Sequence, residues 1–255
     1  MKKFIDRLLR NPISFEITSI FVYAFYCIIF ASAAIPAALL VRFGWAFELG
    51  GGVLELMVFV LICALAFYVF LVSCAVLVGF IERMITLGLK PGEYPVGSSV
   101  FFRWLVYSGL HLWLLTVILP FLRGNNWIKI YLRISGAKVG KGVFVNSNHI
   151  YDAYLLEIGD DVLIGGEAFV NCHLFENGHL ILGKITLGKG TTVGAKAYVT
   201  PGTYTGKDSR IGINTYLRRN TEIRDGESVA SLPGMNIRKV VKLLTAEQKR
   251  DKEKR

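Results

Sequence analysis

The sequence is poor in cysteine and histidine, with four residues of each among 255. Cys27, Cys63 and Cys74 fall within apolar stretches, and only Cys172 lies in the polar part of the chain. This distribution does not make a disulfide framework and fits a reduced, cytoplasmic setting. Metal-ligand spacings, a phosphate-binding loop, a dinucleotide-binding fingerprint and a serine nucleophile elbow are also absent from the sequence. We therefore expect no bound metal and no tightly bound cofactor.

Charged side chains are missing from two long stretches, residues 17–41 and 56–81. The whole chain is 53% hydrophobic and has a mean hydropathy of +0.47, which is typical of a membrane protein with a polar part attached. Each stretch exceeds the roughly 20 residues that cross a bilayer core, so the sequence predicts two transmembrane helices. A cleaved signal peptide is the alternative for the first stretch, because FASAA supplies small residues, but the apolar run continues to Val41.

The placement of Lys and Arg predicts the topology of this pair. Basic residues near membrane ends stay in the cytoplasm. Four of them precede the first stretch, Arg42 alone lies between the two, and three follow the second: Lys2, Lys3, Arg7 and Arg10, then Arg83, Lys90 and Arg103. We expect a helical hairpin with both ends inside, and hence a multi-pass protein of the cell (inner) membrane with a cytoplasmic downstream domain.

A third apolar stretch, residues 104–122, is harder to interpret because its 19 uncharged residues include His111 and Pro120. Either it crosses the membrane or it lies at the membrane surface. The basic residues downstream favour an interfacial or re-entrant helix, with His111 as an interfacial hydrogen-bonding group. The membrane domain would then span residues 1–130, with four side chains at headgroup depth: Trp104, Tyr107, Trp113 and Arg123.

Acidic residues are scarce, with 19 Asp and Glu against 29 Lys and Arg, and the formal net charge is +10. Part of this excess lies in residues 235–255, which the sequence predicts to be a basic helix or tail. Charge alone allows nucleic-acid binding, but a tail on a membrane protein fits better against anionic headgroups, or as a solvated helix with a frayed end. We expect membrane lipids as a partner and no nucleic acid.

The polar part of the chain advances in steps of six residues. From Leu187 it divides into eight hexads, LGKGTT, VGAKAY, VTPGTY, TGKDSR, IGINTY, LRRNTE, IRDGES and VASLPG, of which seven begin with Leu, Ile or Val. The fifth position is small in the first six hexads. The same template fits residues 139–150 and 158–175, and ILGKIT (181–186) joins the two blocks. A period of six matches neither a helix nor a simple strand, so it indicates an internal repeat.

The physical interpretation of this repeat is a triangular solenoid. Each hexad would supply one short strand with its aliphatic residue inward, and three hexads would close one coil of about 18 residues. Stacked coils would pair their backbones and bury a continuous aliphatic ladder. The repeat resembles that of the hexapeptide-repeat acyltransferases, over about residues 131–234. The resemblance implies an all-β left-handed parallel β-helix following the transmembrane hairpin and the interfacial helix.

A narrower resemblance lies in YLRISGAKVG (131–140) and in NCHLFENGHLILGKITLGKGTTVGAKAYVTPGT (171–203). These segments are similar to the membrane-attached terminal domains of polylysine-synthetase-type peptide synthetases. Those domains also combine membrane helices with hexapeptide repeats. No adenylation or carrier domain is present in this sequence, so a partner would have to supply an activated acyl group.

The family transfers an acyl group from a thioester to a hydroxyl or amine, which requires a base for the acceptor proton, and a histidine suits that role. His173 is the first candidate because it lies where the hexads starting at Val170 and Ile181 are eleven residues apart, so a protruding loop leaves the coil. Glu176 would orient its imidazole or hold an acceptor amine.

Asp152 and Asn171 are candidate substrate contacts, and His179 and Cys172 are weaker candidates for catalysis.

His149 is the alternative base. If residues 151–157 form a simple bulge, counting three hexads per coil puts the units at Val145, Val170 and Val193 on one face. His149, His173 and Lys196 would then lie near one another. If residues 151–157 contain an expanded hexad instead, this stacking fails.

The resemblance also implies an acyl-CoA or phosphopantetheine thioester as co-substrate, bound along the later coils. Candidate phosphate ligands and backbone donors are Lys189, Lys196, Gly206, Lys207, Gly212, Arg218 and Arg219. It further implies a homotrimer with sites between subunits.

We therefore predict a membrane-anchored acyltransferase that transfers an acyl group from a CoA or carrier-protein thioester to a hydroxyl or amine acceptor. Two alternatives remain open: amide formation from an aminoacyl or peptidyl carrier protein, and a non-catalytic β-helix scaffold. The sequence does not identify the acceptor or the acyl donor.

Overall fold

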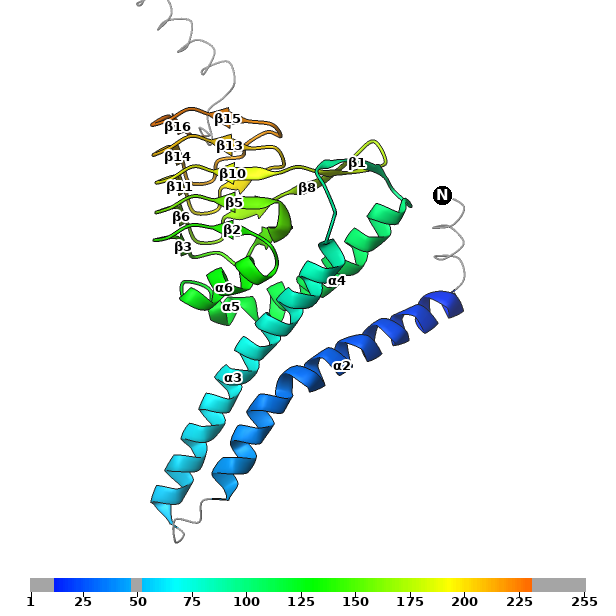
Figure 1. The fold of residues 1–255 in the computed structure, drawn as a ribbon, viewed down its shortest axis with the longest axis vertical. Coiled ribbons are helices and arrows are strands. Elements are labelled where there is room, and N and C mark those ends of the chain that lie inside the picture. The colour runs from blue at the N-terminus through cyan, green and yellow to red at the C-terminus, as the bar shows by residue number, and fades with distance from the viewer. Residues whose placement is uncertain (1–11, 47–51, 231–255) are drawn as a thin grey trace, which may run out of the picture.

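The computed structural model describes residues 12–46 and 52–230, with side chains from residue 23 onward (Figure 1). The basic residues at the N-terminus that contributed to the predicted topology, and the predicted basic helix at 235–255, lie outside the described residues. The description below concerns the described residues alone.

Two long helices form the N-terminal part of the structure: α2 (Pro12–Trp45) and α3 (Val53–Thr86). They pack against each other and extend away from the β-structure (Figure 1). Each contains one of the two predicted apolar stretches and continues beyond it at both ends. Three helices are long and apolar enough to cross a membrane, namely the part of α2 from Tyr23 to Trp45, α3, and α4 (Ser99–Val117).

The third apolar stretch is divided between α4 and the short helix α5 (Leu119–Leu122), and helix α6 (Asn126–Ile134) follows. Trp104 and Tyr107 of α4 are buried inside the protein, so the prediction that they lie at headgroup depth is wrong. Trp113 packs against Phe30 of α2, and Arg123 forms an ion pair with Glu167. One face of α4 therefore packs against the protein interior.

A buried polar cluster joins α3, α4 and α6. Glu82 of α3 is fully buried. Its Oε2 accepts hydrogen bonds from Tyr131 Oη at 2.8 Å and Ser135 Oγ at 2.9 Å, and its Oε1 lies 3.1 Å from His111 Nδ1. His111 was expected at the membrane surface, but it is buried and 2.8 Å from the Tyr131 hydroxyl. A buried carboxylate needs such partners, because an unpaired buried charge is strongly destabilising.

The C-terminal part is a parallel β-helix whose coils have three sides (Figure 1). The first sheet contains β2 (Lys138–Val139), β5 (Leu156–Ile158), β10 (Ile185–Leu187), β13 (Tyr204–Thr205) and β15 (Glu222–Ile223). The second contains β3 (Phe144–Val145), β6 (Leu163–Ile164), β11 (Thr192–Val193), β14 (Arg210–Ile211) and β16 (Ser228–Val229). The third contains β4 (Ile150–Tyr151), β7 (Phe169–Asn171) and β12 (Tyr198–Val199), and Tyr216 bridges to Tyr198.

The hexad pattern predicts the interior of this β-helix correctly. The first residues of six of the eight hexads are buried hydrophobic side chains that stack from coil to coil: Leu187, Val193, Val199, Ile211, Leu217 and Ile223. The small fifth residues are also buried, from Thr191 to Thr215. Thr205 is the one polar residue at the head of a hexad, and its hydroxyl lies 2.9 Å from that of Thr191. Other buried threonines, such as Thr200 and Thr203, donate to backbone carbonyl oxygens, so these interior hydroxyls have hydrogen-bond partners.

The predicted alignment of Val145, Val170 and Val193 on one face is wrong. Val145 and Val193 share the second sheet through Ile164, whereas Val170 pairs with Ile150 in the third. The cause is that β4 (Ile150–Tyr151) forms a side of its own, which the simple-bulge count leaves out. The 3-10 helix η1 (Ala153–Leu155) lengthens the corner before β5, so the alternative of an expanded hexad, in which the stacking fails, is confirmed.

The predicted protruding loop is an ordered β-hairpin. Strands β8 (His173–Glu176) and β9 (His179–Leu182) are joined by Asn177 and Gly178, whose positive φ values of 48° and 75° are typical of a tight hairpin turn. Ile181, predicted to begin a hexad, lies in β9 instead. Strand β9 also pairs antiparallel with β1 (Gly92–Pro95), which follows α3 in the chain. The hairpin thereby ties the helical part to the β-helix.

The close stacking of coils makes a prediction for stability. A methyl group at Gly188 would collide with the backbone of Thr205 and Gly206 in the next coil. We expect Gly188→Ala to lower the free energy of unfolding by about 1 to 3 kcal/mol, as overpacking does. Thermal unfolding in detergent measures this effect. Gly166→Ala is the matched control, because its nearest contact would be at 3.5 Å, and equal destabilisation by both variants would contradict the prediction.

Candidate active site

His173 and Asp152 form a close pair at the base of the hairpin. His173 Nδ1 lies 2.6 Å from Asp152 Oδ2. The Asp152 side chain is fully buried, whereas 16% of the His173 side chain is exposed. Asp152 ends the first coil at the start of η1, with a left-handed backbone (φ 57°) that Asp tolerates better than most residues. His173 begins β8, where the hairpin leaves the second coil.

Helix α4 holds the Asp152 side of this pair. The Trp104 indole Nε1–H donates a hydrogen bond of 2.9 Å to Asp152 Oδ1, the carboxylate oxygen that His173 does not use. The backbone N–H of Asp152 donates to the Tyr107 hydroxyl at 2.9 Å. Trp104 and Tyr107 lie three residues apart and so share one face of α4. A helix from the N-terminal part therefore fixes a carboxylate of the β-helix.

This arrangement determines which nitrogen of His173 is available for chemistry. Because Asp152 accepts at Nδ1, that nitrogen carries the proton and Nε2 keeps its lone pair. No hydrogen bond links Nε2 to any other residue in the described part of the chain. The partly exposed imidazole therefore keeps one nitrogen without a hydrogen-bond partner among the described residues, which a general base requires.

Aromatic rings surround the His173 imidazole. The Trp104 ring lies 4.7 Å from it edge-on, and Tyr151 and Phe175 have ring centroids at 5.9 and 6.4 Å. Burial, followed by the charges of Tyr198 and Asp152, raises the pKa of Tyr151, so its phenol stays protonated. Asn171 accepts a hydrogen bond from the His173 backbone N–H at 3.3 Å and donates one to the Tyr198 hydroxyl. Asn171 thus lies beside the His173 backbone, and its role as a substrate contact stays a prediction.

Glu176 is not the partner of His173 in the structure. Its carboxylate forms an ion pair with Arg219 Nη1 at 3.1 Å, and Arg219 also lies 3.5 Å from Glu93 of β1. His173 and Glu176 are three apart on one strand, so their side chains point to opposite faces of the hairpin. The carboxylate that contacts the His173 imidazole is that of Asp152 instead.

His149 also has a carboxylate partner, but the carboxylate contacts the other ring nitrogen from the one that it contacts in His173. Its Nε2 lies 3.1 Å from Glu167 Oε2, while its Nδ1 is buried without a partner in the described part of the chain. Burial opposes ionisation of Glu167, but hydrogen bonds from His149 and Arg123 outweigh it and lower the pKa of this carboxyl. The imidazole stacks on Phe169 at 4.3 Å. His149 therefore has no accessible nitrogen left for an acceptor.

Two other candidates have structural positions. His179 Nδ1 lies 3.1 Å from the Asn177 carbonyl oxygen at the hairpin turn. Cys172 is fully buried, and burial together with the Asp152 charge raises the pKa of its thiol well above the usual range. A buried, protonated thiol is a poor nucleophile.

The candidate residues for a thioester arm lie at three different corners of the β-helix. Lys196 lies between β11 and β12, Lys207 between β13 and β14, and Arg218 after Tyr216. The N–H groups of Gly206 and Gly212 donate to Ile223 and Val229 in the next coil, so they are not free donors. Lys189 lies 3.9 Å from Asp161, and Arg219 is paired as described above. One chain does not bring this set together.

Sequence reasoning missed Trp104 and Tyr107 as parts of the site, and gave Asp152 only a substrate-contact role. Trp104 is 69 residues before His173, in a segment interpreted as membrane-facing. The one available signal was the polar Asp152 in the irregular segment between two hexad blocks. Across the residues whose side chains are described, no cluster of three metal-ligating side chains occurs.

Comparison with known proteins gives a relative in sequence. No protein-family model matches the chain. Over 190 residues it is 31% identical to delta-poly-L-ornithine synthetase from Acinetobacter baumannii (strain AB307-0294). The match covers 73% of this chain and 14% of that protein, so the chain corresponds to a small part of its relative's length.

Solved structures overlap with the chain in part. A maltose O-acetyltransferase from Clostridium difficile 630 superposes with a TM-score of 0.41 and 17% identity, over 60% of this chain and 93% of that one. Serine acetyltransferase isoform 3 from Entamoeba histolytica, solved with cysteine, gives a TM-score of 0.30 and 15% identity, over 85% of this chain and 77% of that one.

The hexads of this sequence fold into three-sided parallel coils, and 73% of the chain is similar in sequence to a small part of a poly-ornithine synthetase.

Proposed function

We propose that this chain is a membrane-anchored acyltransferase in which His173 is the general base and Asp152 its orienting carboxylate. The observation that carries the proposal is the 2.6 Å contact between a buried carboxylate and a partly exposed imidazole, with Nε2 unpaired among the described residues. The acyl donor is a CoA or phosphopantetheine thioester, and the acceptor is a hydroxyl or an amine.

The chemistry follows from this pair. His173 Nε2 removes the proton of the acceptor as its oxygen or nitrogen attacks the thioester carbonyl carbon. Asp152 stabilises the imidazolium that forms, because its carboxylate lies against Nδ1. When the tetrahedral adduct collapses, the carbon–sulfur bond breaks and the imidazolium returns its proton to the leaving thiolate. No protein group is consumed.

Membrane attachment is part of the proposal. Helix α3 has 34 residues and is thus about 51 Å long, more than the roughly 30 Å of a bilayer core, so it would cross obliquely or project beyond the bilayer. Large apolar side chains are exposed along it and along α4, including Leu54, Leu61, Phe80, Leu105 and Val106. With α2 and α3 as a transmembrane hairpin, the β-helix lies on the cytoplasmic face of the cell membrane.

A homotrimer of left-handed coils would complete the thioester site. The basic residues Lys196, Lys207 and Arg218 lie at three different corners of one chain. Packing three β-helices side by side brings a corner of one subunit against a different corner of its neighbour, which gathers such cations into one groove for a phosphate-bearing arm.

The sequence relationship to a poly-ornithine synthetase favours a second candidate function. In this version the donor is an aminoacyl or peptidyl carrier protein and the acceptor is an amine, so the product is an amide. The same His173–Asp152 pair would serve, since deprotonating an amine makes the same demand on the base.

The identity of the donor separates these candidates. We expect the purified chain to transfer label from acetyl-CoA or from an acyl-loaded carrier protein to a hydroxyl or amine acceptor, measured as acceptor-dependent release of free thiol. Transfer only from an aminoacyl-loaded carrier to an amine would select amide formation. Failure with every donor and acceptor pair would contradict the proposed function.

Removing the base tests the assignment of His173. We expect His173→Ala to lower kcat by about 10² to 10⁴-fold with the fold retained, because no other described nitrogen replaces Nε2. Asp152→Asn should also lower kcat, since the imidazolium loses its counter-charge. Steady-state kinetics and circular dichroism measure the two effects. His149→Gln is the control, and a loss of kcat as large as that of His173→Ala would move the base to His149.

The indole of Trp104 should act as a positioning group. Trp104→Phe keeps an aromatic ring beside His173 but removes the donor to Asp152 Oδ1. We expect kcat to fall on the order of tenfold with little change in KM, because a hydrogen bond to a charged group is lost away from the substrate. Trp113→Phe on the same helix is the control. An unchanged kcat, or a change only in thermal stability, would assign Trp104 a packing role alone.

A further inference from the structure

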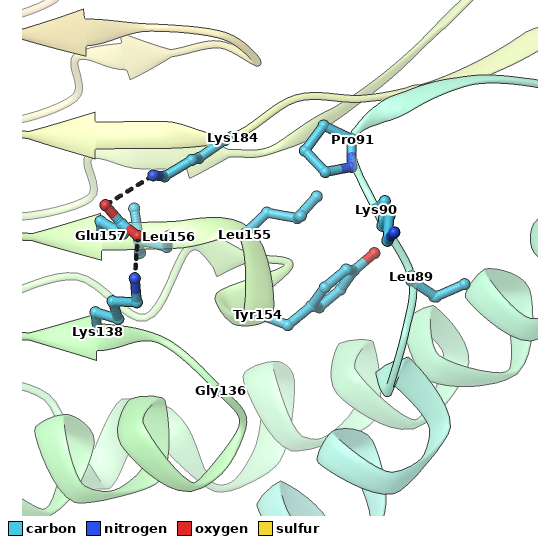
Figure 2. A pocket seen from close by; sticks show the side chains of 10 residues that line it. All are labelled: Leu89, Lys90, Pro91, Gly136, Lys138, Tyr154, Leu155, Leu156, Glu157 and Lys184. Carbon is cyan, nitrogen blue, oxygen red and sulfur yellow. Dashed lines mark hydrogen bonds and ion pairs between the residues drawn. The ribbon is translucent and has the colours of Figure 1, made fainter.

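A cavity of about 280 Å³ lies where the helical part meets the first coil of the β-helix (Figure 2). The connector after α3 forms one wall, η1 and β5 form another, and Lys138 and Lys184 border it. The cavity shares neither His173 nor Asp152. It is therefore distinct from the candidate active site, although both lie beside η1.

The polar side of this cavity is cationic. Glu157 bridges Lys138 and Lys184, with Nζ to carboxylate distances of 2.6 and 2.8 Å (Figure 2). Hydrogen bonds from Lys138 and then Lys184 lower the pKa of Glu157, so this carboxyl is ionised at neutral pH. Lys90 adds a third ammonium group from the connector. Lys138 and Lys184 thus share one carboxylate, and Lys90 lies at the opposite end of the cavity, so the lining has an excess of positive charge (Figure 2).

The other side of the cavity is apolar, with one polar atom unsatisfied. Leu89, Leu155 and Leu156 are buried and line this side. The Tyr154 hydroxyl is buried without a hydrogen-bond partner in the described part of the chain, and Figure 2 shows it on the side of Lys90. Burial, then the Asp152 charge, raises the pKa of Tyr154, so its hydroxyl keeps a proton to donate. The cavity therefore offers a neutral donor as well as ammonium groups to an anion.

The cavity lies directly beyond an exposed apolar stripe. Phe80, Met84 and Leu87 recur at helical spacing at the C-terminal end of α3, and each is more than half exposed. Leu89 and Lys90 of the cavity wall follow within three residues. A basic pocket at the cytoplasmic end of a membrane helix is a typical site for a phosphate headgroup whose acyl chains lie along the helix.

We propose that this cavity binds the phosphate of an anionic membrane-lipid headgroup. The Lys90 ammonium group and the Tyr154 hydroxyl are its ligands, Lys138 and Lys184 add positive charge from the other end of the cavity, and the acyl chains lie against the Phe80–Leu87 stripe. The proposal rests on the membrane attachment in the proposed function and not on the transfer reaction. Glu157 neutralises part of the positive charge of the two distal lysines, so charge removal at Glu157 and at the lysines should act in opposite directions.

The test uses the full chain in neutral detergent micelles that contain phosphatidylglycerol, with lipid retention measured by native mass spectrometry. We expect Lys90→Gln and Lys184→Gln each to weaken retention by roughly fivefold, since one lysine near anionic lipid contributes about that factor. Glu157→Gln should strengthen retention. Lys141→Gln is the control, because Lys141 is exposed on the same coil but does not line the cavity.

Retention that is unchanged in Lys90→Gln, Lys184→Gln and Glu157→Gln would overturn the proposal. Weaker retention in Glu157→Gln would overturn it as well. Glycerol phosphate, inorganic phosphate or coenzyme A, added at the concentration of the lipid, should not reduce lipid retention. If one of them displaces the lipid, the cavity binds a soluble phosphate compound, and the lipid assignment is overturned. His173→Ala should retain lipid like the unmodified chain, so loss of activity and loss of lipid binding are separable. A chain that associates with no lipid vesicle would instead contradict the membrane attachment.

Discussion

The carboxylate of Asp152 is the group on which the arrangement of the site depends. It is fully buried and would destabilise the fold without partners, and it is satisfied on both oxygens, by His173 from the hairpin and by Trp104 from α4. Those two partners come from different parts of the chain, and neither belongs to the coil that contains Asp152. Satisfying one buried charge therefore fixes the relative positions of the first coil, the hairpin and the helix.

The same dependence recurs elsewhere in the structure. Within the helical part, Glu82 gathers His111, Tyr131 and Ser135 from α4 and α6, and between the two parts β1 pairs with the hairpin strand β9. Polar contacts of this kind are directional, so they set an orientation that apolar packing alone would leave loosely defined. The imidazole of His173 lies within this rigid frame, which keeps its Nε2 at one fixed place.

The periodic part of the fold could be predicted from sequence, and the irregular part could not. The hexads identify the buried ladder from Leu187 to Ile223 because each inward position depends only on its distance from the last one. The alignment of the first coils failed because β4 forms a side that the simple-bulge count omitted, and the 3-10 helix after it hides this side from the hexad pattern. His173 was identified because it stands at a break in the period, whereas Trp104 was interpreted as a membrane anchor. An indole beside apolar residues has the same local pattern whether it faces lipid or a buried carboxylate.

Because α4 contacts Asp152, the β-helix domain and the candidate site have different boundaries in the chain. The coils from β2 to β16 bury their own ladder and close their own sheets, so by the criteria of folding they form a domain. The His173–Asp152 pair is supported by a hydrogen bond from Trp104, which lies outside that domain. A boundary drawn at the first strand would thus preserve the solenoid but separate Asp152 from one of its two hydrogen-bond partners. Under the proposed function, the part of the chain that holds the catalytic pair in place is therefore longer than the β-helix and includes α4.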